Sequence, residues 1–201
     1  MRISSIFPTL IGETDVADGA LNAALAEHIH SLERTSPDYS ALSTVNHGWQ
    51  SGFDLLDHDA PPICALRRHF DAAIETFLAD WGRASFGGLV PRGFRYKYNG
   101  WAVILRGGGF QHEHVHTRSD LVGVYYVSVP RQLTGGELTL IDPRAGRVAS
   151  RAMWDSSVLS VVPRAGLLVL FPTFVPHRVD QLTTDGERIS INFDVTLEGI
   201  T

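Results

Sequence analysis

The sequence is poor in cysteine, in basic side chains and in long apolar runs, and each shortage excludes a class of protein. Cys64 is the single cysteine in 201 residues, which excludes an internal disulfide framework and a cysteine-rich zinc knot. Lys and Arg total 17 against 22 Asp and Glu, and with a formal net charge of -5 we expect no nucleic-acid partner. No apolar run reaches the ~18 residues of a membrane-spanning helix, and no secretory signal is recognisable. We therefore expect a cytoplasmic protein that does not span a membrane.

The length and the 44% hydrophobic content suit one globular domain over residues 1–201. The first part, residues 1–90, carries helical patterns. Apolar residues recur at steps of three and four from Asp59 to Trp81, behind a proline-primed first turn, and predict one helix. A weaker pattern of the same period predicts an earlier amphipathic helix that begins near Asp18.

The second part, residues 91–201, changes to the two-residue period of β-strands, with turn clusters such as Gly107-Gly108-Gly109. Eight or so short strands over roughly one hundred residues are typical of a jelly roll. The predicted fold class is therefore mainly β (α+β): a double-stranded β-helix, or jelly roll, with the N-terminal helices packed on one sheet. The strands expected are Phe94–Tyr98, Trp101–Arg106, Phe110–His116, Leu121–Val129, Glu137–Ile141, Val158–Val162, Leu167–Phe171, Val175–Gln181 and Arg188–Thr196.

A histidine-dense segment, Gln111-His112-Glu113-His114-Val115-His116, is the strongest chemical signal. Alternate residues of a strand share one face, so His114 and His116 would stand about 6.6 Å apart along the chain and grip one metal ion. His177 follows late enough for a jelly roll to return it beside them as a third ligand. A metal ion that has imidazole ligands on one side and open coordination positions on the other is more typical of non-haem Fe(II) than of structural zinc. His112 is interpreted as a rim residue.

An arginine accompanies the histidines in the last predicted strand. Arg188, Ser190 and Asn192 occupy alternate positions and share one face. An arginine that points into a β core would be an uncompensated buried charge, so it requires an acidic guest, and its planar fork matches a carboxylate.

These residues resemble the 2-oxoglutarate and Fe(II)-dependent oxygenases, in particular a short bacterial and phage branch with an HxH motif. The resemblance covers nearly the whole chain. It implies that His114, His116 and His177 are the iron ligands and that Arg188 pairs with the far carboxylate of 2-oxoglutarate. Ser190 would assist Arg188 in binding this carboxylate. Tyr126 stands at a position similar to that of the tyrosine with which the prolyl hydroxylases bind the cosubstrate. The segments that carry the resemblance are Trp101 with His114-Val115-His116, Gly123-Val124-Tyr125-Tyr126-Val127, Ile141-Asp142-Pro143-Arg144, Phe171-Pro172 with His177, and Arg188-Ile189-Ser190.

The sequence departs from the superfamily at one ligand. Most of its members carry Asp or Glu where His116 stands, which gives two histidines and one carboxylate. Asp120, four residues past His116, is therefore a reserve ligand, whereas Glu113 would point to the opposite face of a strand. The choice between His116 and a carboxylate such as Asp120 stays open at this stage.

The resemblance implies a dioxygenase that uses Fe(II), O2 and 2-oxoglutarate to hydroxylate its substrate, with release of succinate and CO2. The alternative is a cupin, because Gly108, His114, His116 and Asp120 resemble the first cupin motif. A cupin of this kind would be an isomerase, another dioxygenase or a ligand-binding module. That reading leaves Arg188 without a role. The sequence does not identify the substrate, so a small molecule and a protein side chain both stay open, as does a homodimer.

Overall fold

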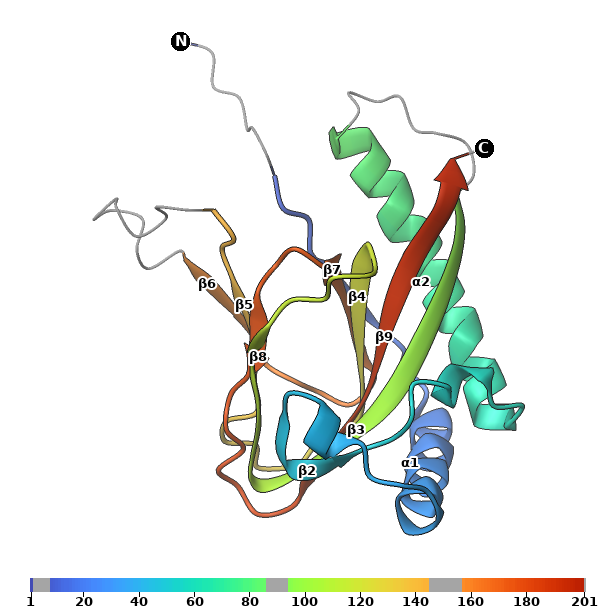
Figure 1. The fold of residues 1–201 in the computed structure, drawn as a ribbon, viewed down its shortest axis with the longest axis vertical. Helices are drawn as coiled ribbons and strands as arrows, with labels where there is room; N and C mark the ends of the chain where they lie inside the picture. Colours follow the sequence, from blue (N-terminus) through green and yellow to red (C-terminus); the bar gives the residue numbers. More distant parts are fainter. Residues whose placement is uncertain (2–7, 86–93, 145–156, 201) are drawn as a thin grey trace.

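The computed structural model describes residues 1, 8–85, 94–144 and 157–200. Two helices lie on the side of β3 and β9 that faces away from β5, β6 and β8 (Figure 1). The N-terminal elements are β1 (Gly12–Asp15), α1 (Gly19–Thr35), the 3-10 helix η1 (Ser40–Leu42), β2 (Val45–Gln50), the 3-10 helix η2 (Leu55–Asp57) and α2 (Pro61–Ser85). The strands that follow are β3 (Phe94–His114), β4 (Leu121–Ser128), β5 (Leu138–Ile141), β6 (Val158–Val161), β7 (Leu167–Pro172), β8 (His177–Val179) and β9 (Glu187–Ile200).

Both predicted helices are confirmed. Asp18 caps α1, because its side-chain Oδ1 accepts a hydrogen bond from the backbone N–H of Leu21 at 2.9 Å. The helix then buries Leu21, Leu25 and Ile29, the apolar stripe read from the sequence. In the described part of the chain, neither helix is both long and apolar enough to cross a bilayer.

The strands form the predicted double-stranded β-helix. Hydrogen-bonded neighbours follow the order β1-β7-β4-β9-β3-β8-β5-β6, β2 pairs with β3, and every ladder between these strands is antiparallel. Two strands come from the part of the chain for which only helices were predicted. Gly12–Asp15 adds the edge strand β1, and Val45–Gln50 pairs with the middle of β3.

One prediction is wrong in the C-terminal half. The three strands expected over Phe94–Tyr98, Trp101–Arg106 and Phe110–His116 are a single strand, β3, that ends at His114. The glycine cluster bends the strand without interrupting it, because Gly108 adopts a φ of 87° that glycine tolerates and its N–H donates to the carbonyl of Leu182 at 2.7 Å. Before the bend β3 pairs with β9, and after it with β8, so β3 connects the two sheets of the roll.

The side-chain alternation of β9 separates the hydrophobic core from the polar interior. Ile189, Ile191 and Phe193 face the helices, where the rings of Phe70 in α2 and Phe193 stack at 4.1 Å. The other face of β9 carries Arg188, Ser190, Asn192 and Asp194. A second apolar cluster lies inside the roll, between the sheets; it includes Val122, Val124, Tyr126, Leu138, Leu140, Phe171 and Val175.

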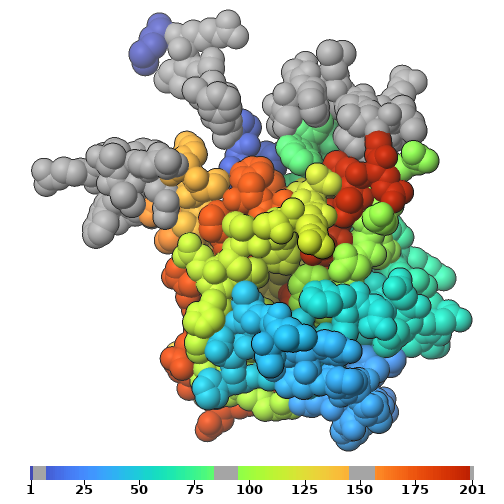
Figure 2. Space-filling model, in the orientation of Figure 1, coloured from blue at the N-terminus to red at the C-terminus, as the bar shows by residue number. Residues whose placement is uncertain are grey.

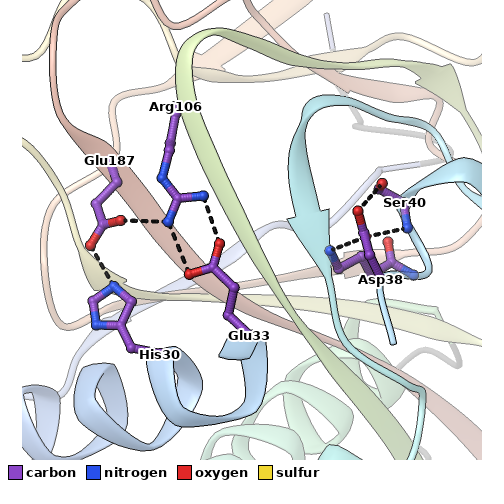
Figure 3. Close-up of polar contacts among 7 residues, drawn as sticks. His30, Glu33, Asp38, Ser40, Arg106 and Glu187 are labelled. Atoms are coloured by element: carbon purple, nitrogen blue, oxygen red, sulfur yellow. Dashed lines mark hydrogen bonds and ion pairs between the residues drawn. The ribbon is translucent and has the colours of Figure 1, made fainter. Parts of the chain in front are cut away.

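A charged cluster joins α1 to the middle of β3 and to the start of β9 (Figure 3). Arg106 of β3 donates to both carboxylate oxygens of Glu33 in α1 and to Glu187 of β9. His30 of α1 reaches Glu187 at 2.6 Å. In the same view, Asp38 accepts hydrogen bonds from Ser40 and so orders the loop that leads into β2. Ion pairs this exposed stabilise a fold only slightly, so the cluster mainly fixes where α1 sits beside β9.

Candidate functional site

The structure brings His114, His116 and His177 together. The antiparallel register of β3 and β8 places His177 directly opposite His114, and His116 follows two residues past the end of β3. One ligand atom from each ring lies within 4.8 Å of the other two. In the described part of the chain, this is the only group of three or more His, Cys, Asp or Glu side chains with that geometry. Two neighbouring strands and the loop that follows β3 therefore build one metal-binding cluster.

Each of the three rings is anchored through its Nδ1 atom. The Nδ1 of His114 lies 2.7 Å from the carbonyl oxygen of His112, and that of His177 lies 3.0 Å from the carbonyl oxygen of Val175. The Nδ1 of His116 lies 2.5 Å from Oδ1 of Asp194. Carbonyl and carboxylate oxygens only accept hydrogen bonds, so each Nδ1 carries a proton. Nε2 is therefore the atom that each ring would offer to a common metal ion.

Burial keeps two of these rings neutral. Burial, and after it the neighbouring ring of His114, lowers the pKa of His177 to about 3. The pKa of His114 is also below its usual value, first because of burial and then because of His116. At neutral pH a metal ion therefore need not displace protons from these two rings.

Arg188 lies next to the cluster and is fully buried. Its Nη1 donates to Ser190 Oγ at 3.2 Å, and its Cζ lies 4.7 Å from the ring centroid of Tyr126. Its Nε and Nη2 have no hydrogen-bond partner among the described residues, and no carboxylate pairs with it there. The hydroxyl of Tyr126 and Nδ2 of Asn192 are likewise buried without a partner in the described structure. A buried cation beside unpaired polar groups fits an anionic guest with carboxylate oxygens.

One small cavity connects the metal cluster with the arginine. The three histidines and Arg188 line it together, and the rest of its wall comes from Trp101, Gln111, Val122, Val124, Leu138, Val179 and Asn192. A cosubstrate that chelates a metal at one end and presents a carboxylate at the other matches this arrangement. Both an Fe(II) ion and 2-oxoglutarate therefore fit the residues present.

Asp120, the predicted reserve ligand, is not brought to the cluster. Its Oδ2 accepts a hydrogen bond from the backbone N–H of Leu197 at 2.8 Å, where β4 and β9 lie side by side. It is absent from the metal-binding group found among the described residues. The carboxylate that does contact a ring of the cluster is that of Asp194, which was not predicted although Asp194 continues the alternation of Arg188, Ser190 and Asn192 by one step.

Aromatic side chains also lie beside the metal cluster, and their contacts with it were not predicted. The Trp101 ring stacks on His116 with centroids 5.9 Å apart, and Phe53 packs edge-on against Trp101 at 5.0 Å. Phe53 is 50% exposed, so this row of rings runs from the cluster to the surface. In Figure 2 the blue-to-cyan segment that follows α1 lies beside the yellow-green end of β3, next to a recess in the surface. An aromatic residue in an apolar run is typical of a core position, so the local pattern did not predict the contact of Trp101 with His116.

The comparisons with known proteins agree with this geometry. Residues 99–194 match the family model described as "Putative 2OG-Fe(II) oxygenase". No curated protein matches the sequence. A prolyl-4-hydroxylase of Pseudomonas putida shares 19% identity over 94% of this chain and 93% of that chain, with a TM-score of 0.67. A prolyl hydroxylase in complex with a hypoxia inducible factor peptide, from Trichoplax adhaerens, shares 12% identity over 92% and 83%, with a TM-score of 0.61.

HygX from Streptomyces hygroscopicus, solved with nickel, 2-oxoglutarate and hygromycin B, shares 14% identity over 96% of this chain and 85% of that chain, with a TM-score of 0.61. At these identities the solved structures establish the shared fold. The matched segment, which contains all three histidines, Tyr126, Arg188 and Ser190, is therefore similar to the 2-oxoglutarate- and Fe(II)-dependent oxygenases. This similarity favours the oxygenase over the cupin alternative.

Proposed function

We propose that His114, His116 and His177 hold the Fe(II) ion and that Arg188 holds the far carboxylate of 2-oxoglutarate. The observation that carries this proposal is the fully buried guanidinium of Arg188, which has two nitrogens without partners among the described residues and lines the same cavity as the three histidines. A buried cation that stays unpaired would destabilise the fold. A dicarboxylate guest would pair with the arginine and remove that penalty.

Ser190 and Tyr126 orient the guanidinium for this task. Ser190 Oγ accepts from Nη1, which leaves the remaining guanidinium donors for a carboxylate. The Tyr126 ring supports the planar group from one side, and its buried hydroxyl offers one more hydrogen bond. Burial raises the pKa of Tyr126, partly countered by the nearby Arg188, so that hydroxyl stays protonated and donates.

When bound, Fe(II) and 2-oxoglutarate supply the oxidation: O2 is consumed, the cosubstrate leaves as succinate and CO2, and one oxygen atom enters a C–H bond of the substrate. The protein's part is to bind and to exclude water. The neutral rings of His114 and His177 keep their metal-binding atoms free of protons. Val122, Val124 and Leu138 line the cavity with apolar surface, which strengthens the polar contacts inside it.

The substrate we propose is a small molecule or a protein side chain that reaches the iron past Trp101 and Phe53. Both kinds of guest occur in similar structures, since one was solved with a peptide fragment and another with hygromycin B.

We also propose a single domain over residues 1–201, a helical part followed by the jelly roll, in the cytoplasm. The lone Cys64, which needs no oxidising compartment, supports this location.

Turnover without substrate tests the proposed function. We expect uncoupled turnover, so that the purified protein with Fe(II), 2-oxoglutarate and O2 forms succinate slowly without substrate. A metabolite and peptide screen is then expected to find compounds that stimulate succinate formation. Succinate is measured directly, with an anaerobic sample and a His177→Ala sample as controls. Absence of succinate at every iron loading, in protein that binds the metal, would contradict the proposal.

A further inference from the structure

His116 is held differently from the other two proposed ligands. His114 and His177 face each other across the ladder between β3 and β8, so the backbone fixes both. His116 lies two residues past the end of β3, outside any strand. Its ring is placed by side chains instead: Asp194 contacts Nδ1, and Trp101 stacks on the ring with 22° between the planes. The orientation of His116 therefore depends on its neighbours.

Asp194 is well placed to orient that ring. Its backbone pairs with Asn99 of β3 on one side and with Val122 of β4 on the other, so the carboxylate projects from the middle of the sheet. The side chains of His116 and Asp194 are only 12% and 22% exposed. Among the described residues, His116 is the only hydrogen-bond or ion-pair partner of the Asp194 carboxylate. Asp120 is directed elsewhere, to the backbone N–H of Leu197.

The charges of the proposed site require a carboxylate. The metal brings two positive charges and Arg188 brings one, whereas 2-oxoglutarate brings two negative charges and the three imidazoles bring none. One positive charge is left in a largely buried cavity, where it is costly. Sites built from two histidines and one carboxylate cancel that charge with the ligand itself. Here the only carboxylate in contact with a proposed ligand, among the described residues, is Asp194.

We propose that Asp194 is a positioning residue that takes over the work of the missing carboxylate ligand. It holds the proton on Nδ1 of His116, so that Nε2 faces the metal, and it supplies the negative charge through the imidazole rather than by direct coordination. The inference rests on the proposed ligand roles of the three histidines. Asp194 and His116 together then replace the single Asp or Glu of the more common site.

Metal titration of the full-length protein tests the inference, with Co(II) as the probe and both calorimetry and the visible Co(II) spectrum as readouts. Asp194→Asn keeps a hydrogen-bond acceptor but removes the charge, and Asp194→Ala removes both. Because loss of such an outer partner costs about 10- to 100-fold in metal affinity, we expect the first near the lower and the second near the upper end of that range. Asp120→Asn is the matched control and is expected to bind Co(II) like the wild type.

The combination with His116→Asp separates a specific role from a general one. In that background the charge sits on the metal itself, so adding Asp194→Asn is expected to leave Co(II) affinity unchanged or to raise it. Equal losses from Asp194→Asn in both backgrounds would overturn the inference, as would wild-type affinity in both Asp194 variants. Unfolding of the metal-free variants at the wild-type temperature would exclude a folding defect, and the Asn variant carries the test if the Ala variant does not fold. If the wild type itself binds no Co(II), the proposed function fails instead.

Discussion

Replacement of His114 or His177 with alanine is expected to weaken metal binding several hundredfold. Structural zinc sites with four protein ligands bind the metal with about 10–16 kcal/mol, which is about 3–4 kcal/mol per ligand. We expect the loss of one histidine here to cost about that much binding free energy. Both rings meet the third in one cluster, and Asp120, the carboxylate expected as a reserve ligand, is engaged with Leu197 instead. Calorimetric titration with Co(II), and the rise in unfolding temperature that saturating metal produces, measure the effect.

His112 provides a matched control for this experiment. It occupies the alternate position before His114 on β3, but its exposed ring packs edge-on against Phe110, and only its backbone carbonyl contacts the Nδ1 of His114. Because His112→Ala keeps that carbonyl, we expect metal affinity close to the wild type. A loss as large as that of His114→Ala would place the metal elsewhere on the strand.

Arg188→Met is expected to abolish the response to 2-oxoglutarate and to leave the unliganded protein at least as stable as the wild type. Removal of one partner from a buried, hydrogen-bonded charge pair costs about 3 kcal/mol or more, which weakens 2-oxoglutarate binding by at least about 100-fold. Without the guest the same guanidinium is an unpaired buried charge, so an apolar side chain of similar length is expected to raise stability by about 1 kcal/mol, or about 2–4 °C in unfolding temperature.

Thermal unfolding of the metal-loaded protein, with and without 2-oxoglutarate under anaerobic conditions, measures both the stability of the variant and its stabilisation by 2-oxoglutarate. Arg178→Met is the matched control: Arg178 follows His177 in β8, but it is partly exposed and pairs with Asp180 at 2.7 Å. That variant is expected to keep the stabilisation by 2-oxoglutarate. An Arg188→Met protein that is stabilised as much as the wild type would remove Arg188 from the binding site.

Local patterns were sufficient for the helices and for much of the site. The stripe of Leu21, Leu25 and Ile29 and the cap at Asp18 depend on neighbours within one or two turns, and both are seen. The alternation from Arg188 to Asn192 is equally local, and it predicts which face of β9 is polar. The same rule placed His114 and His116 on one side, although His116 lies past the end of the strand.

Features that depend on pairing between distant segments could not be read in the same way. β1 and β2 are short, and their partners, β7 and β3, lie far along the chain. Gly107-Gly108-Gly109 reads as a turn because glycine permits positive φ, but the backbone there bends while its hydrogen bonds continue on a new partner strand. The contact of Asp194 with His116 requires both the register of β9 and the path of the loop after β3, and neither is encoded in local spacing.

The most direct test of the central claim is an anaerobic titration of 2-oxoglutarate into the Fe(II) protein, followed by visible absorption. If three imidazoles and Arg188 serve one cavity, a weak charge-transfer band is expected to grow with added 2-oxoglutarate and to saturate at one molecule per chain. The band is expected to require both the metal and the cosubstrate. Protein that binds Fe(II) and 2-oxoglutarate without producing any such band would show that the two occupy separate places, and would contradict the account.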